Sequence, residues 1–270
     1  MAERNDWDDD DLTRLEAASP RLPTPHLSGH LATDGARIWY ASFGSGPAVL
    51  LLHGGHGHSG NFAHQVPALT AAGYQVVTID TRGHGRSTRD ERPFTYRQFA
   101  TDALAVLDHL EIDRAAIVGW SDGAVTGLLA AMAAPERVAG LFFFACNVDD
   151  TGTRPFEFTP VIGRMLGAHK RDYAALSATP DQFDTLFEDV GEMQSTQPNL
   201  TAADLATVAV PVWSVIGDGD EFITRAHAQY LAATIPNARF RLLENVTHFA
   251  PLQRPDTFNA AMLDFLSETV

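Results

Sequence analysis

The stretch that most constrains the fold is residues 115–125, Ala-Ala-Ile-Val-Gly-Trp-Ser-Asp-Gly-Ala-Val. Its first half is apolar and β-branched, which is typical of a buried strand, while residues 123–134 are rich in Ala and Leu, which is typical of a helix. Ser121 stands between them, in a G-x-S-x-G pattern. This pattern predicts a sharp turn that strains the serine backbone and a helix whose N-terminus favours negative charge beside the hydroxyl. An ordinary strand-to-helix turn is the simpler interpretation of the same residues.

The rest of the chain alternates apolar runs with helical patterns. Runs that are apolar at every position predict strands buried on both faces, so the sheet is expected to be covered by helices. We therefore expect an α/β fold, a mostly parallel, doubly wound sheet whose ligands bind at the carboxyl ends of its strands. The strands are expected at residues 27–32, 36–43, 48–52, 75–80, 115–120, 138–145, 212–216 and 240–243. Helices are expected at residues 60–72, 95–110, 123–134, 224–233 and 255–266.

Three regions are distinguished along the chain. Residues 1–27 are acidic and rich in proline, which predicts a lead-in with at most a short helix at 11–18. Residues 28–146 and 209–270 carry the alternation and form the expected core. Residues 147–208 lack a strong strand and predict a small helical cap over the carboxyl edge of the sheet, where it would exclude water. Helical pieces in it are expected at residues 158–166, 170–177 and 181–190, with Thr201 capping another.

Composition limits the partners. The chain of 270 residues carries a formal net charge of −15, which argues against binding nucleic acid or an anionic membrane. A neutral or cationic small molecule fits this charge better. The single cysteine, Cys146, excludes an internal disulfide, and no signal peptide or membrane-spanning run is present, so a cytoplasmic location is expected. Nothing in the sequence sets the oligomeric state.

Five motifs, in order along the chain, give it a resemblance to the α/β-hydrolase fold family. They are His53-Gly54-Gly55, the Asp-x-Arg-Gly-x-Gly-x-Ser loop at 80–87, the G-x-S-x-G turn, Gly217-Asp218-Gly219-Asp220 and Val246-Thr247-His248-Phe249. The order Ser, Asp, His is the one this family uses. The resemblance covers residues 28–268 and is specific for the fold, but one fold hosts many chemistries.

The resemblance implies a serine hydrolase. Ser121 would be the nucleophile, His248 the general base that takes its proton, and Asp220 the acid that orients the imidazole. Asp149 is an alternative position for the acid, whereas Asp218 fits a turn residue better. A serine nucleophile excludes the halide and epoxide chemistries of the family, which need a carboxylate.

The family's oxyanion hole would use two backbone N–H groups, those of Gly55 and Asp122. His53 and His84 also lie inside motifs and are expected to be structural or pocket-wall residues. The loop at 82–87 is expected to be scaffold.

Neither a metal nor a nucleotide cofactor is expected. The pair His56-x-His58 is too short a cluster to hold a metal without acid partners. The glycine-rich loops lack the G-x-G-x-x-G spacing of a dinucleotide site.

The sequence Gly-Trp-Ser-Asp-Gly also resembles that of the valacyclovirase-like (biphenyl hydrolase-like) serine hydrolases, whose acid after the serine recognises a substrate amine. By this resemblance Asp122 would hold an ammonium near the scissile ester. The alternative is that Asp122 only favours the first turn of its helix. Four acids of the expected cap either line an electronegative entrance or face solvent: Asp184, Glu188, Asp189 and Glu192. The substrate-binding residues expected are Asp122, His56, Trp120, Asn147 and Phe249.

The expected activity is hydrolysis of a carboxylic ester of a small molecule through an acyl-enzyme, with amine-bearing esters as one substrate class. The same triad would also cleave a carbon–carbon bond, a lactone or an amide, and a haloperoxidase-like side activity is compatible with it. A ligand receptor with slow turnover would keep the same residues. The sequence leaves the substrate and the leaving group open.

Overall fold

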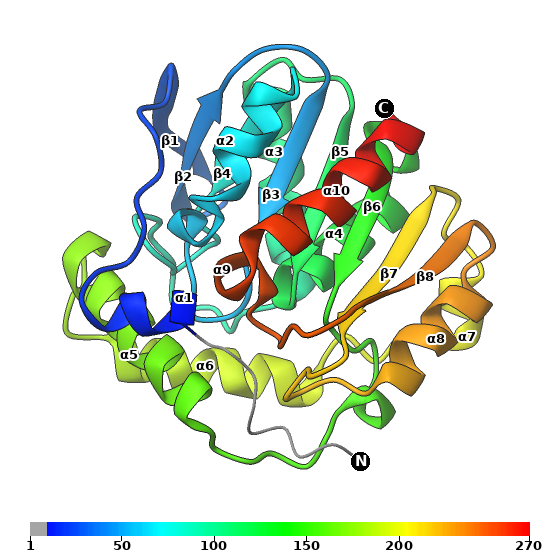
Figure 1. Cartoon of the computed structure of the whole chain (residues 1–270). Helices are drawn as coiled ribbons and strands as arrows, with labels where there is room; N and C mark the ends of the chain where they lie inside the picture. Colours follow the sequence, from blue (N-terminus) through cyan, green and yellow to red (C-terminus); the bar gives the residue numbers. More distant parts are fainter. Residues whose placement is uncertain (1–9) are drawn as a thin grey trace.

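A computed structural model describes residues 10–270, coloured from blue to red along the chain in Figure 1. The strands are β1 (Leu27–Thr33), β2 (Ala36–Phe43), β3 (Ala48–Leu52), β4 (Gln75–Ile79), β5 (Ala115–Trp120), β6 (Val138–Phe144), β7 (Val212–Gly217) and β8 (Ala238–Leu243). The helices are α1 (Asp10–Thr13), α2 (Gln65–Ala71), α3 (Tyr96–His109), α4 (Asp122–Ala133), α5 (Pro160–Leu176), α6 (Phe183–Thr196), α7 (Ala202–Leu205), α8 (Arg225–Thr234), α9 (Ala250–Gln253) and α10 (Pro255–Thr269). Short 3-10 turns are η2 (Arg14–Glu16), η3 (Ser59–Phe62), η4 (Pro135–Arg137) and η5 (Asp150–Gly152).

Within residues 10–270, eight strands form one sheet in the order β1-β2-β4-β3-β5-β6-β7-β8. Only the pairs β1–β2 and β2–β4 are antiparallel, and every pair from β4 to β8 is parallel. The expected mostly parallel α/β sheet is therefore confirmed. Its central strands are buried at every position, as the continuous apolar runs predicted.

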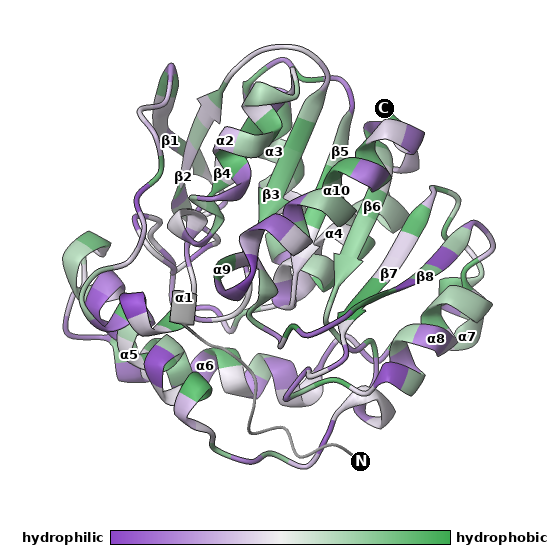
Figure 2. Cartoon of the chain, viewed as in Figure 1, coloured by the Kyte–Doolittle hydropathy of each residue, from purple (hydrophilic) through white to green (hydrophobic). Residues whose placement is uncertain are grey.

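Helices cover both faces of this sheet. One apolar cluster joins α3, α4 and α8 to the sheet, and a second joins α2 and α10 to its other face. In Figure 2 the hydrophobic colour is concentrated on the central strands β3, β5 and β6. Within residues 10–270, none of the helices combines the length and apolarity needed to cross a membrane.

The segment 147–208, here called the inserted segment, connects β6 to β7. Figure 1 shows its helices α5 and α6 lying across the edge at which the parallel strands end. The two helical pieces predicted at 158–166 and 170–177 are one continuous helix, α5, because its apolar face runs unbroken through Ile162, Met165 and Tyr173. Helix α6 also extends beyond the predicted residue 190, since Met193 continues its buried face.

The N-terminal lead-in packs on the protein more closely than its acidic, proline-rich composition predicted. Its part before residue 10 lies outside the described residues. The expected helix at 11–18 is instead the short α1 and η2, whose Leu12 and Leu15 are buried in the same cluster as residues of α5 and α9. Glu16 also forms an ion pair with Arg164 of α5, with Oε1 2.9 Å from Nε. Burial of two leucines explains why this segment docks on α5.

Candidate active site

The turn after β5 has the strained geometry that its sequence predicted. Ser121 has φ 54° and ψ −123°, a conformation that side chains with a Cβ rarely adopt. The flanking glycines are required by close packing. A Cβ at Gly119 would lie 2.5 Å from Cα of Ala124, and a Cβ at Gly123 would lie 2.0 Å from the carbonyl oxygen of Leu52. Strand and helix thus pass each other at van der Waals contact and present Ser121 at the edge of the sheet.

The structure brings His248 and Asp220 together from two different loops. Nδ1 of His248 donates to Oδ2 of Asp220 at 2.9 Å, and both side chains are buried. Oδ1 of Asp220 accepts the backbone N–H groups of Phe222 and Ile223 at 2.9 and 2.8 Å, so its orientation is fixed. Burial by itself lowers the pKa of His248, but the charge and the hydrogen bond of Asp220, aided by Glu221 and Asp122, raise that pKa above its usual value.

The other candidate acids lie elsewhere. Asp149 accepts from the backbone N–H and the hydroxyl of Thr151, at 2.9 and 2.5 Å, and so caps η5. Asp218 is a turn residue, with Oδ1 3.4 Å from the backbone N of Val246. Of these acids, Asp220 is the one that contacts the imidazole of His248.

Glu221 belongs to this cluster and was not anticipated from the sequence. Its Oε2 accepts the backbone N–H of His248 at 2.9 Å. Burial raises the pKa of the Glu221 carboxyl, although the contact with His248 opposes the shift. Its position next to Asp220 in the sequence was the only available signal, and turn acids usually face solvent.

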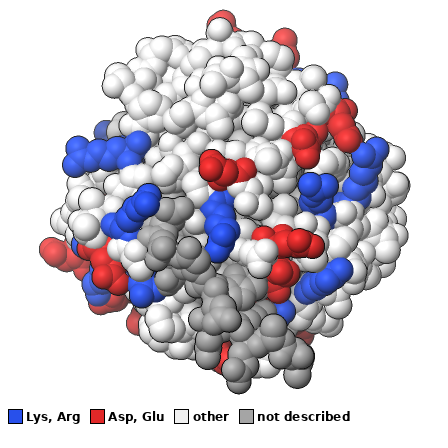
Figure 3. All heavy atoms as spheres, in the orientation of Figure 1, with Lys and Arg blue, Asp and Glu red and all other residues white. Residues whose placement is uncertain are grey.

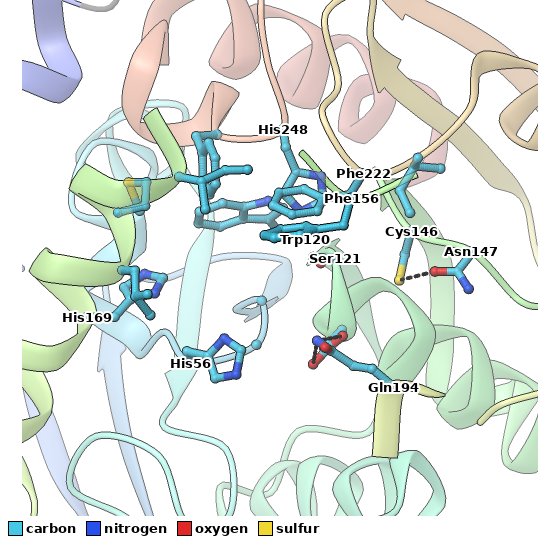
Figure 4. Close-up of a pocket in the computed structure, with 18 of the residues that line it drawn as sticks. His56, Trp120, Ser121, Cys146, Asn147, Phe156, His169, Gln194, Phe222 and His248 are labelled. Carbon is cyan, nitrogen blue, oxygen red and sulfur yellow. Dashed lines mark hydrogen bonds between the residues drawn. The ribbon is translucent and has the colours of Figure 1, made fainter. Parts of the chain in front are cut away.

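Ser121 and His248 line one cavity of about 480 Å³ between the sheet edge and the inserted segment. Its walls come from the loops after β3, β5, β6, β7 and β8, and from α3, α5 and α6. All five residues predicted to bind substrate line it, namely Asp122, His56, Trp120, Asn147 and Phe249. Figure 4 shows His248 and Phe222 on one side of Ser121 and Gln194 on the other, with the Trp120 ring alongside the serine. The rings of Trp120 and His248 have centroids 6.2 Å apart.

The turn after β3 lies against the serine. A Cβ at Gly54 would be 3.1 Å from Cβ of Ser121, and a Cβ at Gly55 would be 2.7 Å from Oδ2 of Asp122. Asp122 is the first residue of α4, so its backbone N–H has no acceptor within the helix. The two residues predicted to supply oxyanion donors therefore line the same cavity as Ser121.

The Asp122 side chain is held from two directions by residues that the sequence did not single out. The hydroxyl of Tyr96, on α3, donates to Oδ1 at 2.8 Å, and Nε2 of Gln194, on α6, lies 3.1 and 3.0 Å from Oδ1 and Oδ2. Burial raises the pKa of Asp122, against the lowering effect of these hydrogen bonds and of His248. Neither partner has a sequence signature, because each is distant along the chain.

The remaining histidines near the site differ in role. His53 and His84 do not line the cavity; they bond the backbone oxygens of Gly54 and Arg82 at 2.8 and 3.0 Å, as expected of structural residues. His56 does line it, and burial lowers its pKa to about 4. Across residues 10–270, no group of three or more His, Cys, Asp or Glu side chains is arranged to hold a metal ion.

The cavity has an unbalanced set of charges. Among the described residues that line it, none is Lys or Arg, and Asp122 is the acidic one. The four acids singled out in the inserted segment do not line it. Two of them form ion pairs, Asp184 with Lys170 and Asp189 with Arg89. On the face seen in Figure 3, acidic and basic side chains are interspersed.

Comparison with known proteins agrees with this architecture. Residues 47–150 match the family described as alpha/beta hydrolase fold. The serine hydrolase BPHL of Mus musculus is 27% identical over 255 residues, covering 90% of this chain and 87% of that protein. The 3-oxoadipate enol-lactonase 2 of Acinetobacter baylyi is 27% identical over 265 residues, covering 89% and 97%. The solved structure of Est816, described as an N-acyl homoserine lactone degrading enzyme, superposes with a TM-score of 0.68 at 27% identity, covering 88% of this chain and all of that one. The chain therefore has the α/β-hydrolase fold, and its similarity to these proteins supports a hydrolase.

Proposed function

We propose that this protein is a serine hydrolase that cleaves a carboxylic ester through an acyl-enzyme. Ser121 is the nucleophile, His248 the general base and Asp220 the acid that orients it. The observation that carries this proposal is the buried 2.9 Å contact of His248 with Asp220, on a histidine that lines the same cavity as the strained Ser121.

The reaction follows from these positions. Because Nδ1 of His248 donates to Asp220, Nε2 is the nitrogen that accepts the serine proton. Oγ of Ser121 bonds to the ester carbon while the carbonyl oxygen becomes an oxyanion, which the N–H groups of Gly55 and Asp122 receive. Collapse breaks the bond to the alcohol oxygen, which takes the proton from His248. Water, deprotonated by the same histidine, then releases the acid and restores Ser121.

We assign the core to residues 28–146 and 209–270 and a lid role to the inserted segment. The lid role is supported by α5 and α6, which contribute Ile162, Met165, Leu166, His169, Phe187 and Gln194 to the cavity wall. Walls of this kind exclude water from a reacting ester and strengthen the electrostatic interactions inside.

The charge of the cavity favours neutral or cationic substrates over anionic ones, since Asp122 is acidic and no Lys or Arg is among the described residues of its lining. An amine-bearing ester is the cationic candidate, with Asp122 as the partner of its ammonium. Lactones are the second candidate class. They are favoured by the similarity to the enol-lactonase and to Est816, and a lactone opens by the same attack on its carbonyl carbon.

The experiment that tests the proposal is turnover of p-nitrophenyl acetate and of a simple lactone by wild type and Ser121→Ala. The variant should lose at least about 10⁴-fold in kcat. Mass spectrometry of acid-quenched wild type should find the acyl group on Ser121. Ser195→Ala, which replaces an exposed serine of α6 outside the cavity, is the matched control. Full activity of Ser121→Ala would refute the proposal.

A further inference from the structure

Three phenylalanines at the cavity stand out because they are exposed. Phe156 is 67% exposed, Phe158 65% and Phe187 43%, and all three line the cavity that contains Ser121. Half of the large hydrophobic side chains exposed in the described chain are therefore gathered at this one cavity. Single exposed apolar residues are normal on a protein surface, but a cluster of them marks a binding surface.

Each of the three rings packs against another residue of the protein. Phe156, which precedes α5, stacks on Phe222 with ring centroids 6.4 Å apart. Figure 4 shows this pair on the same side of the cavity as His248. Phe187, on α6, stacks on His56 at 4.6 Å, at an angle of 22° between the ring planes. Phe158 lies over Gly163, where an added Cβ would be 3.3 Å from its ring.

The interior of the cavity continues this apolar surface. Trp120, Phe222 and Phe249 surround the serine from the core, and Ile162, Met165 and Leu166 face it from α5. Besides His248, the histidines that line the cavity are His56 and His169. Both are neutral near pH 7, because burial lowers the pKa of His56 to about 4 and that of His169 to about 3. With no Lys or Arg among the described lining residues, a carboxylate at the end of the substrate would have no cationic partner.

We propose that Phe156, Phe158 and Phe187 form an apolar rim at the mouth of the cavity. The rim holds an uncharged aliphatic or aryl group of the substrate at the point where the substrate extends out of the cavity. This inference rests on the proposed function and names its substrate class: hydrophobic esters or lactones that are larger than the cavity. The occupant is the substrate itself because the rim is continuous with the walls around Ser121. A long chain anchored at the serine therefore has to pass over the rim.

The test is a chain-length series of soluble p-nitrophenyl alkanoates and of alkyl acetates, each kept below its micellar concentration. In wild type, kcat/KM should rise about fourfold for each methylene that becomes buried. The double variant Phe156→Ser and Phe158→Ser should weaken the dependence of kcat/KM on chain length in at least one of the two series. Its kcat/KM should be about tenfold below that of wild type for the longest esters, and less than twofold below it for the acetate of the shortest alcohol. Both residues are exposed, so the fold should persist. Tyr230→Ser, which removes an exposed ring of α8 away from the cavity, is the matched control.

Binding separates this inference from the proposed function. Calorimetric titration of Ser121→Ala with methyl alkanoates measures binding at the rim without turnover. The affinity should rise with the length of the alkanoate chain. It should fall when Phe156→Ser and Phe158→Ser are combined with Ser121→Ala. If wild type hydrolyses no ester or lactone, the proposed function fails while this titration still decides the rim. If the rim substitutions leave both the kinetic and the binding series unchanged, the inference is wrong. The same holds if they alter only vesicle binding or oligomeric state, because the rim would then contact a lipid surface or a second copy of the chain.

Discussion

Nε2 of Gln194, on α6 of the inserted segment, lies within 3.1 Å of both carboxylate oxygens of Asp122, the residue that follows Ser121. The wall of the cavity is thus bonded to the first residue of α4, whose N–H is a proposed oxyanion donor. Gln194→Ala should lower kcat/KM by about tenfold, since a hydrogen bond to a charged group contributes roughly 1.5–3 kcal/mol and water will replace part of it. Steady-state kinetics on one ester measures this effect. Gln182→Ala, an exposed amide that precedes the same helix, should leave the rate unchanged, and equal effects of the two substitutions would contradict the role of Gln194.

The pH dependence of activity should follow His248. Its pKa is raised above 6.5, and the base must be neutral, so kcat/KM should rise with pH through a value above about 6.5. The sign for stability is opposite: the imidazolium stabilises the fold below pH 6.5, and this contribution is lost as pH rises through the raised pKa. pH–rate profiles and melting temperatures across pH 5–9, roughly the range of these titrations, measure both.

Asp220→Asn removes the group that raises this pKa and leaves the burial that lowers it. The rise of kcat/KM with pH should therefore occur at lower pH than in wild type. The plateau value of kcat/KM should fall about 10⁴-fold, because the histidine loses its orienting acid. Asp218→Asn, in the same turn but exposed, is the control and should keep the wild-type profile. If kcat/KM of Asp220→Asn rose over the same pH range as that of wild type, the titrating group would not be His248.

Asp122→Asn separates the two interpretations of this acid. If the carboxylate holds an ammonium, kcat/KM for an aminoacyl ester should fall roughly 10–100-fold, while a matched neutral ester changes little. The preference of wild type for the amine should also disappear at acidic pH, because burial raises the pKa of Asp122 and the carboxylate is neutralised early as pH falls. Equal losses on both esters would leave Asp122 with a structural role at the helix N-terminus.

Two glycine substitutions test the packing at the serine turn. Gly123→Ala should destabilise the fold by at least about 1–3 kcal/mol, since its Cβ would lie 2.0 Å from the backbone oxygen of Leu52. Gly191→Ala, in the middle of α6 with no atom within 4 Å of the new Cβ, should stabilise the protein by up to about 1 kcal/mol. Thermal and denaturant unfolding measure both. A stable Gly123→Ala variant would contradict the close approach of β3 and α4.

The sheet and the serine turn could be predicted because both are written in short stretches of sequence. The strand at 48–52 is apolar at every position and is buried at every position. The two glycines of G-x-S-x-G lie where the structure has no room for a side chain. The geometry of the turn could therefore be predicted from the residues that form it. The inserted segment was harder: its two expected helices are one, α5, because its apolar face continues through the residues between them.

The sequence by itself determined the order of strands and helices, the strained position of Ser121 and a short set of acids for His248. Only the tertiary structure decided which acid meets that histidine, since Asp220 and His248 are 28 residues apart and join through the packing of two loops. It likewise decided that Gln194 reaches Asp122 across 72 residues, that Leu12 and Leu15 dock on α5, and that three phenylalanines share one cavity. The physical reason is that periodicity and turn chemistry act over a few residues, whereas contacts between distant side chains depend on how whole elements pack.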